Sequence, residues 1–85
     1  MKTLKIKAKL LNGHEREWNF TECHNENDYG NGNYIAADRG EEKYYIDVRY
    51  AKNYDFKQIC IEEIKAFYGK NLVSYEVVQW QTHKN

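Results

Sequence analysis

The segment from Thr3 to Leu10 alternates without a break between apolar and polar side chains, and this pattern constrains the fold more than any other feature of the chain. A period of two is typical of a strand with one buried face and one face in water. The apolar positions are Leu4, Ile6, Ala8 and Leu10, and the positions between them are Lys5, Lys7 and Lys9. We therefore predict a half-buried strand over residues 3–10.

An Asn12-Gly13 pair follows and predicts a hairpin turn. A two-residue loop would set Trp18 opposite Lys7 and mix the apolar and polar faces. A three-residue loop, with Gly13 in the left-handed region, keeps both faces consistent, so we predict this bulged hairpin. Its pairs are Ile6 with Trp18, Leu4 with Phe20, Lys9 with Glu15 and Lys7 with Glu17.

The rest of the chain contains one polar, glycine-bearing stretch and four further elements. We expect a long loop at 22–33, a short strand at 34–37, a strong strand at 43–51, a helix from Asn53 to about Tyr68, and a last strand at 72–82. Gly69 is a good helix stop. An even-numbered turn would place Ile35 beside Tyr44. In the helix, the positions expected to face the sheet are Phe56, Cys60, Ile64 and Phe67. In the last strand, Val73, Tyr75 and Val77 are expected inward, and Ser74, Glu76, Val78 and Trp80 outward.

This order of elements predicts an α+β fold, in which a single helix packs on one face of a mixed, mostly antiparallel five-stranded sheet in two layers. The element order is β-β-β-β-α-β. A right-handed crossover through the helix should set the last strand parallel to the fourth, beside it or one strand away. With 85 residues, of which 41 % are hydrophobic, the chain (1–85) is expected to form a single domain with its own core.

Charge, hydropathy and codon bias limit the partners, the cellular location and the source that we expect for the protein. Thirteen basic residues balance thirteen acidic ones, which disfavours strong nonspecific binding to nucleic acid. No stretch approaches the roughly 20 apolar residues of a membrane span, so we expect a cytoplasmic protein without a membrane role. Residues with AT-rich codons predominate, which favours an AT-rich bacterium, its phages or its mobile elements as the source.

Reactive and metal-binding patterns are weak. Cys23 and His24 are adjacent, but neighbours in an extended chain point in opposite directions and no third group surrounds them. A zinc site would need these two residues to converge with His14 and His83, and no paired metal-ligand motif exists. Cys60, among isoleucines, is interpreted as a buried thiol. We therefore expect neither a catalytic residue nor a metal.

The glycine-bearing loop does not match a ligand-binding motif either. An EF-hand alignment beginning at Asn25 puts Tyr29 at a ligand position and Ala36 where a glutamate is required. No phosphate-binding glycine string occurs. We expect no cofactor.

Two further features admit a functional and a structural interpretation. Lys5, Lys7 and Lys9 line one face of a strand, as in sheets that bind nucleic acid, but glutamates are predicted opposite them. Glu63 falls inside the apolar arc of the helix, where a carboxylate is either half-buried with a raised pKa or reaches solvent at the edge of the arc.

The outward side chains of the central and last strands are the candidate binding surface. It comprises Tyr45, Arg49, Val78 and Trp80, residue types that include those enriched at binding hot spots. The alternative is that the loop 22–33 folds over this face and makes it a second, minor core.

These observations favour a noncatalytic protein-binding or accessory module, such as a small inhibitor-type protein, with a protein partner or a second copy of itself. The alternative is a nucleic-acid-binding domain that uses the open sheet face. An enzyme is the least favoured class.

Overall fold

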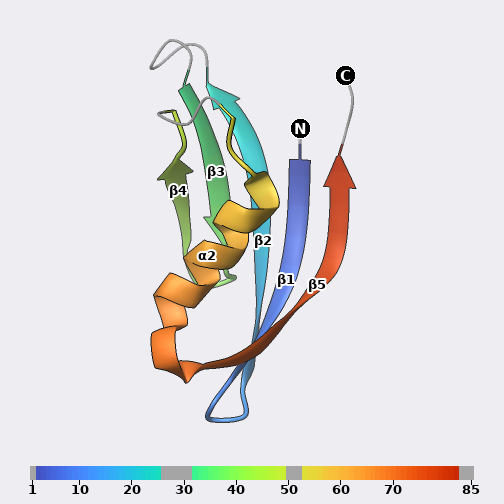
Figure 1. The fold of residues 1–85 in the computed structure, drawn as a ribbon, viewed down its shortest axis with the longest axis vertical. Helices are drawn as coiled ribbons and strands as arrows, with labels where there is room; N and C mark the ends of the chain where they lie inside the picture. Colours follow the sequence, from blue (N-terminus) through green and yellow to red (C-terminus); the bar gives the residue numbers. More distant parts are fainter. Residues whose placement is uncertain (1, 26–31, 50–52, 83–85) are drawn as a thin grey trace.

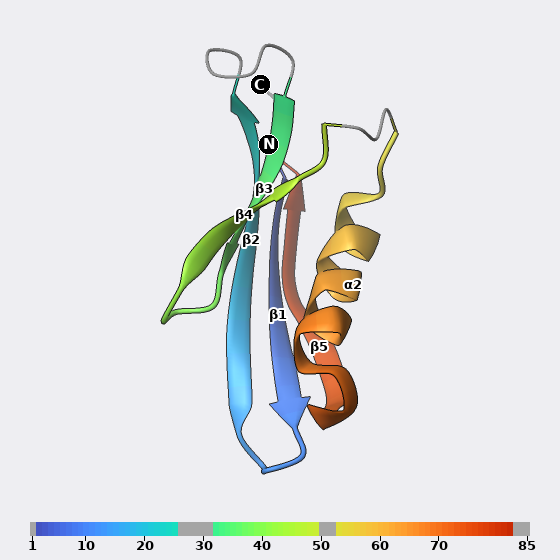
Figure 2. The ribbon, with the colours of Figure 1, turned by 90° about the vertical axis from the view of Figure 1, so that its left-hand side faces the viewer.

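The computed structural model describes residues 2–25, 32–49 and 53–82, which form one five-stranded sheet with a helix on one side of it (Figures 1 and 2). The elements are β1 (Lys2–Leu10), β2 (Glu15–Asn25), β3 (Gly32–Asp38), β4 (Lys43–Asp47), α2 (Phe56–Tyr68), the 3-10 turn η1 (Gly69–Asn71) and β5 (Leu72–Thr82). The strand order is β4-β3-β2-β1-β5. The predicted α+β fold and element order are confirmed.

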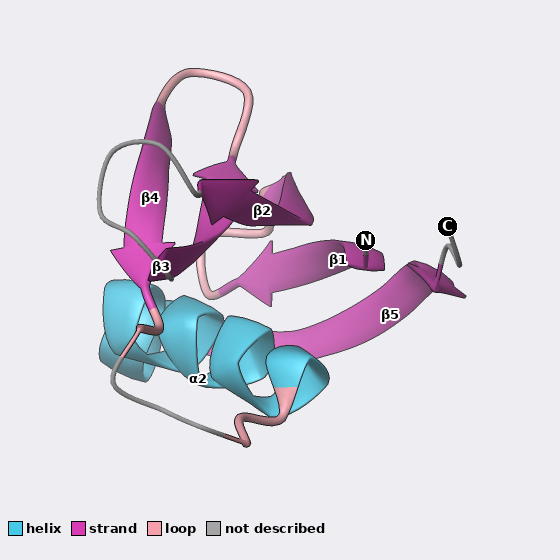
Figure 3. Cartoon of the chain, turned by 90° about the horizontal axis from the view of Figure 1, so that it is seen from above, coloured by secondary structure: helices cyan, strands magenta, loops and turns pink. Residues whose placement is uncertain are grey.

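The predicted neighbourhood of the last strand is wrong. β5 pairs with β1, and three strands separate it from β4, so the two lie at opposite edges of the sheet (Figure 3). β4 and β5 run in the same direction, but they are not paired with each other. All four pairings among the described strands are antiparallel, so the sheet is not mixed. Pairing with β1 has a physical advantage, because it gives β1, which buries Leu4, Ile6 and Ala8 in the core, a hydrogen-bonded neighbour on both sides.

The predicted first hairpin is confirmed in register and in turn geometry. Ile6 pairs with Trp18, and Lys7 with Glu17. Gly13 has φ +87°, which only glycine adopts freely, and its N–H donates to the carbonyl of Leu10 at 3.0 Å. On the outer face, the one away from α2, two of the lysines form ion pairs diagonally, Lys5 with Glu17 at 3.6 Å and Lys7 with Glu15 at 3.7 Å.

The core lies between α2 and the inner face of the sheet. Trp18 is fully buried there: its ring stacks on that of Phe20, with centroids 5.7 Å apart, and its indole N–H donates to the hydroxyl of Tyr68 at 2.9 Å. The buried apolar residues that form this cluster are Leu4, Ile6, Ala8, Trp18, Phe20, Ile35, Ala37, Val48, Phe56, Cys60, Ile61 and Ile64. Buried side chains of β1, β2 and β3, of Val48 just after β4, and of α2 thus meet in a single layer.

Several predicted boundaries shift. Strand pairing extends β2 to Asn25 and starts β3 at Gly32, so the predicted loop 22–33 is partly strand; its residues 26–31 lie outside the described part of the chain. β4 ends at Asp47 rather than at residue 51. Ile35 pairs with Ile46, not with Tyr44, a change of two residues that keeps the same face toward the core.

The helix α2 begins at Phe56, because the carboxylate of Asp55, not Asn53, accepts the N–H of Gln58 at the first turn. The predicted stop at Gly69 is confirmed, with φ +55°.

Candidate functional site

The strand β5 is not a regular strand, and its irregularities decide which residues it exposes. Its register with β1 shifts twice, between Lys5 and Ile6 and between Lys9 and Leu10, and Val78 and Val73 have no partner in the register at those points. An extra residue in one strand of a pair is a β-bulge, which bends that strand and changes the face on which the following side chains lie.

Because of the bulge at Val78, Trp80 lies on the inner face of the sheet and not on the outer face that simple alternation predicted. Trp80 is paired with buried Leu4, and its ring centroid is 5.7 Å from that of Phe56 at the start of α2. Val77, paired with Ile6, is on the same face. The predicted outward position of Trp80 is therefore wrong.

The four residues of the predicted binding surface do not form one surface. Tyr45 is on the outer face of β4, paired with Ala36. Arg49 lies close by, where its Nη2 is 2.7 Å from Oδ2 of Asp47 and its guanidinium stacks over the ring of Tyr34 at 5.4 Å. Val78 and Trp80 are at the opposite edge of the sheet. The structure separates them because β5 crossed to the far side of β1; whether each residue binds a partner stays a prediction.

The edge strand β5 combines length, low charge and exposed apolar side chains. It contains 11 residues, and Glu76 is the one charged residue among them. Its exposed large apolar residues, with their exposed fractions, are Val73 (56 %), Tyr75 (39 %), Val78 (49 %) and Trp80 (43 %). An edge strand presents unpaired backbone N–H and C=O groups, so such a strand is a template for pairing with another chain.

The opposite edge has a different character. β4 contains only five residues, begins at exposed Lys43 and ends at exposed Asp47. Short length and charged side chains are the usual means by which proteins prevent edge pairing. One edge of this sheet is therefore protected and the other is not.

Hydrogen-bond alternation shows which β5 residues direct their backbone away from β1. The N–H of Leu10 donates to His14 of the hairpin, so the even-numbered residues of β1 direct their backbone groups toward β2. The β5 residues paired with even-numbered Ala8, Ile6 and Leu4 are Tyr75, Val77 and Trp80. These three residues therefore place their side chains beside α2 and their backbone groups at the open edge.

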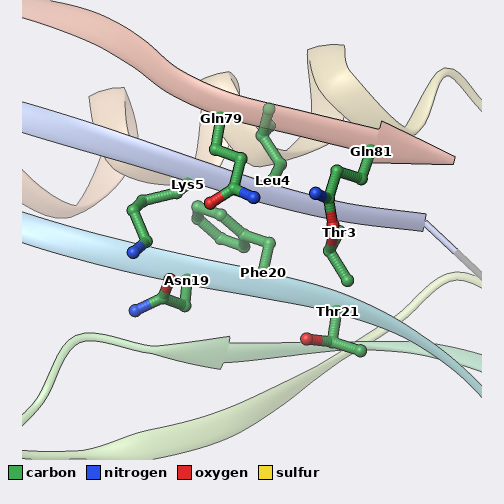
Figure 4. Close-up of a pocket in the computed structure, with 8 residues that line it drawn as sticks. All are labelled: Thr3, Leu4, Lys5, Asn19, Phe20, Thr21, Gln79 and Gln81. Atoms are coloured by element: carbon green, nitrogen blue, oxygen red, sulfur yellow. The ribbon is translucent and has the colours of Figure 1, made fainter.

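The outer face carries a shallow polar cavity of about 230 Å³ over β2, β1 and β5 (Figure 4). The residues that line it are Thr3, Leu4, Lys5, Asn19, Phe20, Thr21, Gln79 and Gln81. Its single cation, Lys5, is paired with Glu17, and the other polar groups at its rim are hydroxyls and amides. Such a lining forms hydrogen bonds, but it offers no nucleophile beside a base.

Two carboxylates on the helix side of the sheet are partners of tyrosine. The hydroxyl of Tyr44 donates to Glu63 at 2.6 Å, and the hydroxyl of Tyr54 donates to Glu22, which is buried. Burial, reinforced by these hydrogen bonds, raises the pKa of both tyrosine hydroxyls. Glu63, half-buried as one of its two interpretations predicted, thus joins α2 to β4. Sequence reasoning missed Glu22, although its even spacing from Trp18 and Phe20 places it on the core face.

The two cysteines lie in different environments. Cys60 is fully buried, and burial raises the pKa of its thiol, which favours the unreactive protonated form. The thiol of Cys23 is 3.6 Å from the carbonyl of Thr21 on the same strand. His14 is exposed at the hairpin, just before the start of β2, whereas Cys23 is near the end of that strand.

Within the described ranges no three His, Cys, Asp or Glu side chains gather as a metal site, and His83 lies outside those ranges. In the same ranges no helix has the length and apolarity to cross a membrane.

Comparison of the chain with family models, with curated proteins and with solved structures finds no match.

Proposed function

We propose that this protein is a noncatalytic protein-binding module that binds through the edge strand β5. The observation that carries the proposal is the contrast between the two sheet edges: β4 is short and charged at its ends, whereas β5 is long, carries one charge and exposes four large apolar side chains. Accessory or inhibitor proteins of AT-rich bacteria, phages and mobile elements form the class that this proposal suggests.

The proposed mode of binding is strand addition. A partner strand beside β5 forms backbone hydrogen bonds with the open-edge groups of Tyr75, Val77 and Trp80, which supply affinity independent of sequence. The side chains of the partner then contact the exposed aromatic residues on the helix side. These contacts supply specificity, because alternate positions of the added strand face alternate sides of the sheet.

The outer face supports the alternative, a nucleic-acid-binding domain, less well. Lys5 and Lys7 form ion pairs with glutamates on β2, and Glu76 of β5 is the register partner of Lys7. The glutamates offset the positive electrostatic potential of these lysines, so the face attracts phosphate groups only weakly. The aromatic residues of β5, Tyr75 and Trp80, lie on the inner face and so do not stack with these lysines.

Site-specific photo-crosslinking tests the proposal. A photoreactive amino acid is placed at Val78 on β5 and, as the matched control, at Tyr45 on β4; each variant is irradiated alone and in a lysate of the source organism. We expect protein adducts from position 78, including adducts with a second copy, and few or none from position 45. Equal adduct formation at the two positions, or none at 78, would overturn the proposal.

A further inference from the structure

We propose that the partner strand is β5 of a second copy of this chain, paired antiparallel about a twofold axis that passes through Val77. This inference rests on the proposed function and names the occupant of the same edge. Its basis is the pattern of side chains, charge and bulges on β5 itself.

The two faces of β5 are complementary to themselves. On the helix side lie Tyr75, Val77 and Trp80, and on the outer side lie the polar residues Ser74, Glu76, Gln79 and Gln81. A twofold axis perpendicular to the sheet keeps each face on the same side in both copies. Apolar residues then meet apolar residues, polar residues meet polar ones, and the two α2 helices lie on the same side of one continuous ten-stranded sheet.

The single charge of the strand restricts the register. An axis through Glu76 sets this carboxylate directly opposite its counterpart in the second copy, and like charges in that position are destabilising. An axis through Val77 sets Glu76 opposite the uncharged bulge at Val78 and Gln79 instead. Charge therefore excludes the first register and permits the second.

In the register with Val77 opposite itself, the bulge at Val78 brings the open-edge residues of the two copies opposite one another on both sides of the axis. The open-edge residues of β5 are spaced by two from Tyr75 to Val77 and by three from Val77 to Trp80. With Val77 opposite itself, Tyr75 comes opposite Trp80 of the second copy, and the extra residue at Val78 fills the same kind of bulge that it fills against β1. Each exposed aromatic ring thereby gains an aromatic cross-strand neighbour, a pairing that stabilises sheets.

Sedimentation equilibrium tests whether the edge pairs. We expect the mass of the wild-type protein to rise with concentration from 10.2 kDa to twice that value. Val77→Pro removes an N–H at the open edge and leaves the hydrogen bonds to β1 intact, so this variant should stay at the mass of one chain, with the circular dichroism spectrum of the folded protein. Tyr45→Pro removes an outward N–H from the other edge and should still dimerise.

Disulfide trapping tests the register, in a Cys23→Ser background. In the proposed dimer the two Val77 Cα atoms are about 5.5 Å apart, which is within the range of a disulfide. Val77→Cys should form covalent dimers on mild oxidation. Ser74→Cys, whose counterpart lies about 20 Å away along the strand, should not. A dimer that crosslinks equally through Ser74→Cys would overturn the register.

The outcomes separate this inference from the proposed function. A wild-type protein that stays at 10.2 kDa at every concentration overturns the second-copy inference. If position 78 still crosslinks to another protein, the proposed function stands with a different occupant. If a dimer forms and Val77→Pro does not weaken it, the dimer uses another surface and the inference is wrong.

Discussion

The hydroxyl of Tyr44 donates a hydrogen bond of 2.6 Å to the carboxylate of Glu63 and so ties the edge strand β4 to the middle of α2. The two residues are 19 positions apart, and the segment between them includes the residues 50–52, which lie outside the described part of the chain. A half-buried carboxylate on the core side of a helix would be costly without such a partner. The pair therefore explains a charged residue where the helix pattern expects an apolar one.

Tyr44→Phe should lower the free energy of unfolding by about 1.5–3 kcal/mol, because it removes a hydrogen bond to a charged group and leaves that group partly buried. Urea denaturation measures the change. The matched control is Tyr45→Phe, one position along on the outer face, where the side chain is 61 % exposed and the change should stay within about 0.5 kcal/mol. Equal losses in the two variants would contradict the role of the pair.

Stability should fall at alkaline pH. The folded protein raises the pKa of Tyr44 and Tyr54 above their ordinary value of 10.0, chiefly through burial. Above that pH the unfolded chain releases these protons while the folded chain retains them. Deprotonation therefore stabilises the unfolded state relative to the folded state, and the free energy of unfolding falls. Melting temperatures from neutral pH to about pH 11 should decline beyond pH 10. The decline should be shallower in a Tyr44→Phe, Tyr54→Phe variant; parallel curves for the two proteins would argue against the assignment.

Trp80→Ala should destabilise the monomer by about 2 kcal/mol, less than a fully buried tryptophan would, because 43 % of the residue is exposed. The loss comes from the packing of Trp80 against Phe56. Thermal unfolding is measured at a concentration where sedimentation shows single chains. Val78→Ala, at the bulge, serves as the control and should change stability by less than about 1 kcal/mol. An unaffected Trp80→Ala protein would show that this contact contributes nothing.

Tyr68→Phe should cost about 1–2 kcal/mol, because the indole N–H of Trp18, fully buried, loses its acceptor at 2.9 Å. A double-mutant cycle with Trp18→Phe isolates the bond. In the Trp18→Phe background no indole donor is left to satisfy, so Tyr68→Phe should then cost much less. A coupling energy near zero would mean that the two side chains act independently.

Gly13→Ala should destabilise the first hairpin by about 1 kcal/mol or more, because a side chain is strained at φ +87° even though space is open around it. Chemical denaturation measures the loss. Leu11→Ala in the same loop, where the side chain is exposed, should change little and serves as the control. Similar small effects at both positions would contradict the strain argument.

Local patterns carried most of the fold. The alternation from Leu4 to Leu10, together with the Asn12-Gly13 turn, admitted only one register with consistent faces, and the structure has that register. The helix and its stop at Gly69 followed from the same kind of local signal. The candidate surface did not follow, because it depended on which strand β5 would join, and two edges were open to it.

What the sequence by itself determined is thus the set of elements, their order and the faces of the first hairpin, since each depends on contacts between residues near one another in the chain. Tertiary structure alone decided that β5 lies beside β1, because that choice depends on how the helix crosses the sheet. It alone decided the bulge at Val78 as well, since a bulge is one extra residue counted against a particular partner strand, here β1. That one extra residue moved Trp80 from the outer face to the side of Phe56, and no period-two pattern can foresee it.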